Sequence, residues 1–223
     1  MRRSDLILSF LYPVVVEKTG SRWNPHLEVV ITGGKYAMNS ANANYSYGSL
    51  YSLFKKIFRR TQIDWNKINE VLVLGFGAGG VAEIINKYKG DCRIDGVEID
   101  EQVLALARKY FKTDLLKNVT LFCTSAEEFI SGCKKKYDLV VIDVYNDLNV
   151  PESIESEEFL SGVYGVSAPG GIVIFNKFIH DRKSQDESEK LKEKFGNLFG
   201  EIDTQTVMLT AKVLVARKKV SEG

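Results

Sequence analysis

The stretch VLVLGFGAGGVAEIINKYKGDCRIDGVEID, residues 71–100, decides the fold of this chain. A short apolar run enters a cluster of glycines, a helical pattern follows, and a second apolar run ends in the acids Glu98 and Asp100. Glycines let the backbone approach a ligand, a helix N-terminus offers free N–H groups, and an acid about 20 residues further on can accept hydrogen bonds from ribose hydroxyls. The stretch therefore predicts a strand, a glycine turn, a helix and a second strand that bind a nucleoside-bearing cofactor.

The amino-acid composition limits which classes of protein this chain can belong to. The chain has 223 residues, 44% of them hydrophobic and 26% charged, as expected for a soluble domain with a full core. Its net charge of +1 gives no strong field for nucleic acid or an anionic membrane. Three cysteines without C-x-x-C spacing and only two histidines predict a reducing compartment and no metal site. The apolar N-terminal stretch is interrupted by Asp5 and Pro13 and is too short to span a bilayer, so we expect a cytoplasmic protein.

Ahead of the glycine stretch the sequence has β character. Residues 12–18 and 26–32 are rich in valine and isoleucine and flank a turn-forming segment, which predicts a hairpin with a third strand at 35–38. A helical apolar pattern begins after a polar stretch. We therefore expect an N-terminal β-hairpin region over residues 1–46 and a Rossmann-like cofactor-binding domain over residues 47–223.

Strand and helix patterns alternate after the glycine stretch. Asp100 is placed to cap a helix, and Ser125 begins a capping box, S-x-x-E, with Glu128. The continuous apolar run YDLVVI, residues 137–142, is typical of a central parallel strand buried on both faces, and Asp143 stands at its carboxyl end.

The C-terminal part distinguishes between related folds. A second capping box at residues 184–187 predicts the start of the last helix. The final β patterns, residues 202–208 and 211–216, leave no room for a crossover helix, so they form an antiparallel hairpin. Together with the alternating strands and helices, this predicts an α/β fold with a seven-stranded sheet and one reversed strand, similar to class I S-adenosylmethionine-dependent methyltransferases. A dehydrogenase domain would end in parallel strands, so the hairpin favours S-adenosylmethionine over a nicotinamide dinucleotide.

Five segments, in this order and spacing, resemble the spermidine synthase family and its methyltransferase-like relatives. They cover about half of the chain and are VLVLGFGAGG (71–80), GVEIDEQVLALARKYF (96–111), TSAEEF (124–129), YDLVVIDVYND (137–147) and EEFLSGVYGVSAPGGIVIFN (157–176). The resemblance implies S-adenosylmethionine or decarboxylated S-adenosylmethionine as the cofactor. It also implies a β region at the N-terminus through which the chain forms a homodimer.

The resemblance further implies which residues hold the cofactor. The glycine loop would pass under its aminoacid or thioether end, Glu98 would bind the ribose hydroxyls, and Ile99 would pack on the adenine. Ser125 stands where the family has an aspartate beside the adenine, although it serves equally well as a helix cap alone. The expected cofactor-binding residues are Gly75, Phe76, Gly77, Gly79, Gly80, Glu98, Ile99, Ser125, Ala126 and Asp143.

Asp143 and Asp147 are the candidate catalytic bases. Asp143 follows the fourth strand of the predicted sheet, whose carboxyl end faces the cleft where open α/β sheets bind ligands. Polyamine synthases carry a D-S-T-D-P motif there, whereas this chain has Asp143-Val-Tyr-Asn-Asp147, with Asn146 in place of the second acid. The candidate substrate-binding residues are Tyr45, Tyr47, Tyr145 and Asn146.

These residues leave three functions open. Asparagines and alanines replace the acids that the family carries before the first helix of the domain, and a cationic polyamine needs carboxylates to replace its lost hydration. The sequence therefore favours a methyltransferase that uses S-adenosylmethionine and acts on a small acceptor. The second interpretation is aminopropyl transfer from decarboxylated S-adenosylmethionine to a polyamine. The third is a non-catalytic relative that binds a nucleoside or only assembles.

Overall fold

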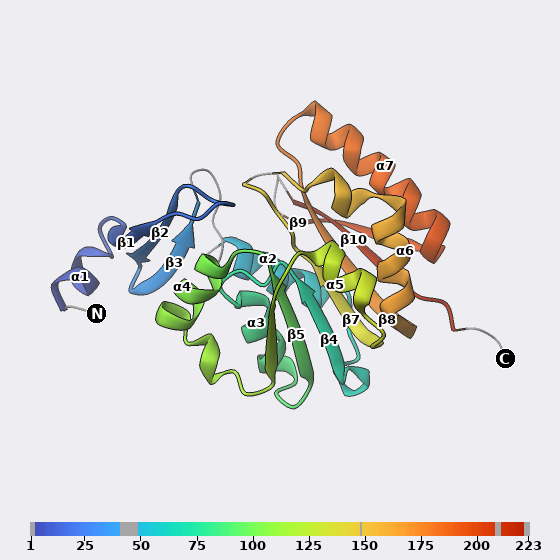
Figure 1. The fold of residues 1–223 in the computed structure, drawn as a ribbon, viewed down its shortest axis with the longest axis horizontal. Coiled ribbons are helices and arrows are strands. Elements are labelled where there is room, and N and C mark those ends of the chain that lie inside the picture. The colour runs from blue at the N-terminus through green and yellow to red at the C-terminus, as the bar shows by residue number, and fades with distance from the viewer. Residues whose placement is uncertain (1–2, 41–48, 148, 208–210, 221–223) are drawn as a thin grey trace.

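A computed structural model describes residues 3–40, 49–147, 149–207 and 211–220. Within these ranges the chain forms a seven-stranded sheet with helices on both faces and, ahead of it, a three-stranded antiparallel sheet (Figure 1). The predicted α/β fold class is confirmed, including the small N-terminal β region. The predicted boundary between two regions, at residues 46 and 47, lies outside the described residues.

The small sheet packs against the main body of the protein. It follows a short helix, α1 (Arg3–Leu8), and its strands in spatial order are β1 (Val14–Thr19), β2 (Leu27–Thr32) and β3 (Lys35–Asn39). Gly33 and Gly34 join β2 to β3 with φ of 54° and 77°, the positive values that a tight hairpin turn requires. One apolar cluster joins this sheet to the rest of the chain: Leu27, Val29, Met38, Ala78, Val103 and Leu106.

The large sheet has the strand order β6-β5-β4-β7-β8-β10-β9. Its strands are β4 (Glu70–Leu74), β5 (Arg93–Glu98), β6 (Val119–Cys123), β7 (Tyr137–Ile142), β8 (Ser167–Phe178), β9 (Ile202–Val207) and β10 (Ala211–Arg217). The strands from β6 to β8 pair in parallel, whereas β10 is antiparallel to both β8 and β9. The predicted terminal hairpin is thus confirmed and contains the reversed strand.

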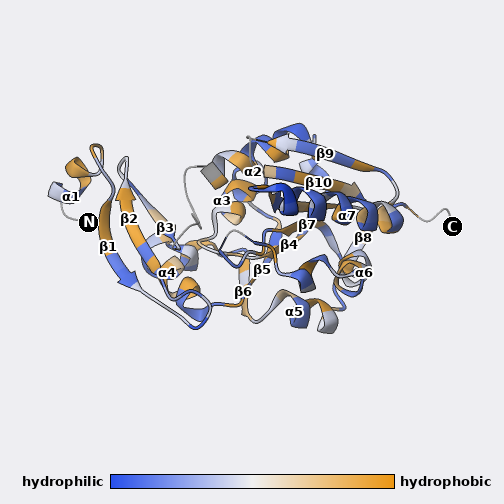
Figure 2. Cartoon of the chain, turned by 90° about the horizontal axis from the view of Figure 1, so that it is seen from above, coloured by the Kyte–Doolittle hydropathy of each residue, from blue (hydrophilic) through white to orange (hydrophobic). Residues whose placement is uncertain are grey.

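Two apolar clusters fill the two faces of the large sheet. The helices on one face are α2 (Ser49–Arg60), α3 (Gly80–Tyr88) and α4 (Glu101–Phe111), and those on the other are α5 (Ala126–Gly132), α6 (Glu157–Val166) and α7 (Arg182–Phe199). In α7 only one stripe, which includes Leu191, Phe195 and Phe199, is buried, and Figure 2 shows the helix as largely hydrophilic. Among the described helices, none combines the length and the apolar composition that a membrane span requires.

The helix caps agree with the sequence at two positions and differ at a third. Asp100 caps α4 by accepting a hydrogen bond from the backbone N of Gln102, and Ser125 caps α5. The last helix is capped by Asp181, which accepts from the backbone N of Ser184 at 2.7 Å, so the capping box begins three residues before the predicted one. An aspartate at the N-cap and a serine at the third helical position satisfy the same backbone groups as the S-x-x-E pattern does.

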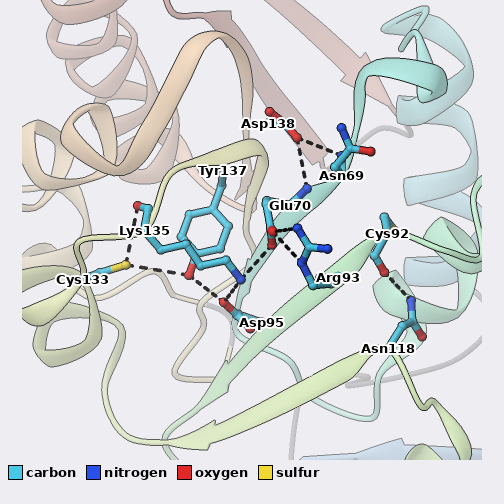
Figure 3. Close-up of polar contacts among 10 residues, drawn as sticks. All are labelled: Asn69, Glu70, Cys92, Arg93, Asp95, Asn118, Cys133, Lys135, Tyr137 and Asp138. Atoms are coloured by element: carbon cyan, nitrogen blue, oxygen red, sulfur yellow. Dashed lines mark hydrogen bonds and ion pairs between the residues drawn. The ribbon is translucent and has the colours of Figure 1, made fainter.

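Polar contacts tie the strands together near their amino ends (Figure 3). Lys135 Nζ lies 2.7 Å from Asp95 Oδ2 and 2.8 Å from Glu70 Oε2. The Tyr137 hydroxyl donates to Asp95 Oδ2 at 2.8 Å, and Arg93 pairs with Glu70. This cluster holds the beginnings of β4, β5 and β7 in register, at the edge of the sheet opposite the glycine turn.

Candidate functional site

A cavity of about 770 Å³ opens at the carboxyl ends of the parallel strands. Its walls come from the glycine turn after β4, the ends of β5 and β7, the loop after β7, helix α2 and the loop between β1 and β2. Ligands of open α/β sheets bind at this edge, where the strand order changes direction. The volume suits a drug-sized ligand, or a nucleoside with a second small molecule.

The glycine turn follows β4 and passes close to the neighbouring strands. Gly75 has a φ of +82°, and a Cβ atom there would lie 2.2 Å from the backbone oxygen of Asp143, so only glycine fits. The backbone N–H groups of Gly75 and Phe76 both donate to the Val97 carbonyl, at 3.0 and 2.9 Å. These contacts fix the turn between the ends of β5 and β7. Gly75, Phe76, Gly77 and Gly80 line the cavity as the sequence predicts.

Gly79 lies in the same turn but does not line this cavity. It precedes α3 with a φ of +83°, and a Cβ atom there would meet the side chains of Thr113 and Phe76 at 2.9 and 3.1 Å. Gly79 therefore differs from the other predicted cofactor residues, which line the cavity. A tight turn and close packing explain this glycine.

Glu98 stands at the end of β5 with its carboxylate in the cavity wall. Its Oε2 accepts a hydrogen bond from the backbone N of Gly77 at 2.9 Å, and its Oε1 accepts from the backbone N of Asp100 at 3.2 Å. Burial raises the pKa of Glu98, while these two backbone hydrogen bonds oppose the shift. A carboxylate has about four lone-pair sites, so Glu98 can still accept from two hydroxyl groups in the cavity. Ile99, the next residue, also lines it.

Ser125 and Ala126 line the cavity at the start of α5. Ser125 Oγ accepts a hydrogen bond from the backbone N of Glu128 at 3.1 Å, which is the capping role. The contact with adenine remains a prediction. Sequence reasoning missed Glu127, which lines the same wall and accepts a hydrogen bond from the Ser153 hydroxyl at 2.5 Å.

Asp143 lies half-buried in the cavity wall at the end of β7. Burial raises the pKa of its carboxyl group to about 7; the nearby Glu98 charge adds to this shift and a hydrogen bond from Asn176 opposes it. In that bond Asn176 Nδ2 donates to Asp143 Oδ1 at 2.9 Å. A carboxyl group with this pKa exchanges a proton near neutral pH, as a general base must.

Asn176, on β8, is a site residue that the sequence analysis missed. It is buried and lines the cavity, and its Oδ1 has no hydrogen-bond partner among the described residues. The Tyr145 hydroxyl donates to the Asn176 backbone oxygen at 2.7 Å, and burial raises the pKa of Tyr145 well above its ordinary value. In the sequence, Asn176 could have been recognised as a site residue because it is the polar residue that ends the apolar run IVIFN.

The loop after β7 carries the second candidate base. Asp147 has a φ of +56°, and its Oδ1 accepts a hydrogen bond from the Ser40 hydroxyl, just after β3, at 3.0 Å. Asn146 forms a backbone bridge with Asn149, and Tyr145, Asn146 and Asp147 all line the cavity. The other two predicted substrate residues, Tyr45 and Tyr47, lie outside the described residues.

The charge of the cavity wall has one sign. Glu98, Glu127, Asp143 and Asp147 line the cavity, and its described lining residues include no lysine, arginine or histidine. Such a wall favours a cationic ligand, and its described residues offer no cationic partner to a ligand carboxylate. Within the described ranges, no group of three or more histidine, cysteine or acidic residues is arranged to hold a metal ion.

Comparison with known proteins identifies the family. Residues 57–211 match the family model for the spermine/spermidine synthase domain. A probable polyamine aminopropyl transferase from Bifidobacterium longum is 29% identical over 153 residues, which make up 67% of this chain and 34% of that protein. In eight curated relatives that this chain matches, the matched part spans 34 to 49% of their length, so the chain covers less than half of each.

Solved structures share the fold. A crystal structure of spermidine synthase in complex with the transition-state analogue AdoDATO has a TM-score of 0.78 at 14% identity and covers 93% of this chain and 75% of that one. Human methyltransferase-like protein 13 in complex with SAH has a TM-score of 0.62 at 17% identity and covers 78% and 82%. The curated relatives from Bifidobacterium longum and Vibrio vulnificus carry the names probable polyamine aminopropyl transferase and polyamine aminopropyltransferase. Because the family model covers more than half of the sequence, this chain belongs to the spermine/spermidine synthase family.

Proposed function

We propose that this protein transfers an aminopropyl group from decarboxylated S-adenosylmethionine, the donor, to a small primary amine. The observation that carries the proposal is the cavity wall, which has four carboxylates and no basic side chain among its described residues. The donor carries a sulfonium and an ammonium group but no carboxylate. S-adenosylmethionine itself brings a carboxylate, for which the described lining offers no cationic partner.

The predicted cofactor residues have the groups needed to bind the nucleoside end of the donor. Glu98 can accept hydrogen bonds from the ribose hydroxyls, because a carboxylate has about four lone-pair sites and the backbone N–H groups of Gly77 and Asp100 occupy two of them. The glycine turn allows a ligand to approach the backbone, since Gly75 and Gly77 both have positive φ. Ile99 offers an apolar surface beside Glu98 for the adenine.

The acceptor end of the cavity supplies the base. When bound, the donor presents an electrophilic carbon beside its sulfonium: the C–N bond to the amine forms as the C–S bond breaks, and sulfur keeps the electron pair to leave methylthioadenosine. Asp143, whose pKa is raised to about 7, accepts the proton that the amine nitrogen loses. Asp147, whose carboxylate accepts a hydrogen bond from the Ser40 hydroxyl, offers the amine a second carboxylate in the same loop.

A product assay tests this proposal. The protein is incubated with the donor and putrescine, and methylthioadenosine and the aminopropylated amine are quantified by mass spectrometry. We expect both products in equal amounts, and we expect Asp143→Asn to lower kcat by about a hundredfold or more, as for loss of a general base. Asp91→Asn, at an exposed position, is the control and keeps full activity. Methylation of an acceptor by S-adenosylmethionine, with no methylthioadenosine from the donor, would overturn the proposal.

A further inference from the structure

The connection between β1 and β2 is an ordered loop that reaches the cavity. Residues 20–26 make it longer than a two-residue hairpin turn, and it has its own hydrogen bonds. The backbone N of Ser21 donates to the Asn24 carbonyl at 2.8 Å, while Ser21 Oγ accepts from the backbone N of Trp23 and of Asn24 at 3.1 and 3.0 Å. These contacts hold the loop in one shape without a ligand.

The loop is attached to the nucleoside end of the site. Ser21 Oγ donates to Asp100 Oδ2 at 2.5 Å, and Asn24 Nδ2 lies 3.5 Å from the same oxygen. Asp100 is only 1% exposed; its other oxygen caps α4, and its backbone N donates to Glu98. One chain of contacts therefore links the loop to the carboxylate that is placed for the ribose.

Trp23 presents its indole ring at this end of the cavity. The ring lines the cavity together with Asn24, Glu98 and Ile99, yet 40% of the residue is exposed. The Arg22 guanidinium lies 4.7 Å from the ring centroid, a cation–π contact that orients the ring. A large, oriented and exposed aromatic surface in a ligand cavity is suited to stacking on a flat ligand.

The small sheet has a second contact with the cavity wall. The Ser40 hydroxyl, just after β3, donates to Asp147 in the loop after β7. The small sheet thus contacts the wall at two places, and the loop with Trp23 is the part attached beside Glu98 and Asp100. This placement assigns Trp23 to the nucleoside rather than to the amine.

We propose that Trp23 is a nucleoside-binding residue whose indole ring covers the adenosyl part of the donor. This inference rests on the proposed function, because it takes an adenosyl sulfur compound as the ligand. Sequence reasoning assigned the donor only to segments after residue 70, and hydrogen bonds from Ser21 and Asn24 to Asp100 join the loop to them.

The two tryptophans of the chain allow a direct test. Trp65 stacks on Tyr88 at 4.7 Å and does not line the cavity, so Trp65→Phe leaves Trp23 as the sole indole fluorophore. Methylthioadenosine is the probe, and its affinity is measured by calorimetry in parallel. In Trp65→Phe we expect a saturable change in Trp23 emission with the calorimetric Kd. In Trp23→Phe we expect no emission change and near wild-type affinity, because a ring is retained.

Removal of the ring gives the decisive comparison. We expect Trp23→Ala to weaken methylthioadenosine binding by about tenfold or more, as for loss of an aromatic stack, while Trp65→Phe keeps wild-type affinity. If wild-type protein binds methylthioadenosine but Trp23→Ala binds equally well and Trp23 emission stays constant, the inference is wrong and the proposed function stands. An emission change with putrescine alone would move Trp23 to the amine side and overturn the inference. Absence of binding to wild-type protein would overturn both.

Discussion

Asp143 ends β7 with its carboxyl group in the cavity wall, where burial raises its pKa from the ordinary 3.8 to about 7. Between these two values the folded protein holds a proton that the unfolded chain releases. Stability contributed by this group is therefore complete below about pH 4 and is lost as the pH rises through 7. A charged ligand in the cavity restores part of this loss, because a cation favours the ionised carboxylate.

The variant Asp143→Asn isolates this effect. At pH 8 we expect the variant to be more stable than wild type by on the order of 3 kcal/mol, because it avoids an ionised carboxylate in the cavity wall. At pH 4 we expect a difference of less than about 1 kcal/mol, because the folded protein then holds the Asp143 proton and the unfolded chain has released it only in part. Urea unfolding at the two pH values measures the difference, with Asp91→Asn as the control. Equal stability differences at both pH values would refute the raised pKa.

Glu98 carries the second prediction for a single residue. Glu98→Ala removes the acceptor for the ribose hydroxyls and leaves the backbone N–H of Gly77 without its partner. We expect methylthioadenosine to bind at least tenfold more weakly, as the loss of a charged hydrogen bond predicts. Calorimetry provides the measurement, and Glu101→Ala, at an exposed position in the first turn of α4, is the matched control. Unchanged affinity in Glu98→Ala would remove Glu98 from the site.

Site residues that end apolar runs could be predicted from the sequence, whereas others could not. Glu98 and Asp143 follow strands that read clearly as buried, so their position at the ligand edge follows from the pattern. Glu127 and Asn176 depend on which strands and helices become neighbours in space, and Trp23 depends on a loop contact across 79 positions of sequence between Ser21 and Asp100. Local periodicity does not contain that information.

At the scale of elements, β4, β5 and β7 have separate functions at their two ends. Their carboxyl ends form the cavity, and their amino ends are joined by the cluster around Asp95 and Lys135 (Figure 3). Tyr137 belongs to that cluster, because its buried hydroxyl donates to Asp95. Stability and ligand binding should therefore respond separately to changes at the two ends.

The variant Tyr137→Phe tests this separation. We expect a loss of about 1–3 kcal/mol of unfolding free energy, because Asp95 loses a buried hydrogen bond. Methylthioadenosine affinity should stay at the wild-type value, since the cluster lies at the opposite edge of the sheet. Urea unfolding and calorimetry measure the two quantities, and Tyr88→Phe, at an exposed tyrosine, controls for the loss of a hydroxyl group. A parallel loss of affinity would show that the two ends are coupled.

Most elements could be predicted from the sequence, because hydrophobic spacing fixes them locally. The capping box of α7 could not be placed correctly, since Asp181 and Ser184 satisfy the same backbone groups as the expected S-x-x-E pattern. The position of β10 between β8 and β9 required the structure, because the hairpin alone does not say which of its strands pairs with β8.

At the scale of the whole molecule, the nearly neutral net charge of the chain does not reveal the negative charge of the cavity wall. The chain has a net charge of +1, yet four carboxylates converge on one cavity whose described lining lacks basic residues. The sequence favoured methyl transfer because it lacks the usual family acids before α2. In the structure, acids from other segments line the cavity, Glu127 among them. The lack of acids before α2 therefore no longer argues against a cationic substrate.

We expect the homodimer interface to lie on the N-terminal surface of the protein. Five large apolar residues of α1 and the segment after it are exposed: Ile7, Leu8, Phe10, Leu11 and Tyr12. An exposed apolar patch is suited to protein association, and a second copy of the chain is the partner that we expect. Light scattering should give twice the 25.1 kDa mass for wild type and the single mass for Leu11→Asp. Leu115→Asp, at a leucine that is also exposed, should stay dimeric; a monomeric wild type would refute the expectation.

The most direct test of the central claim compares two ligands that differ by one carboxylate. Calorimetric titration at pH 8 measures the affinities of decarboxylated S-adenosylmethionine and of S-adenosylmethionine for the wild-type protein. A cavity lined by carboxylates predicts that the decarboxylated form binds at least about tenfold more tightly, a difference of about 1.4 kcal/mol. Equal binding, or tighter binding of S-adenosylmethionine, would contradict aminopropyl transfer and return the protein to the methyltransferase interpretation.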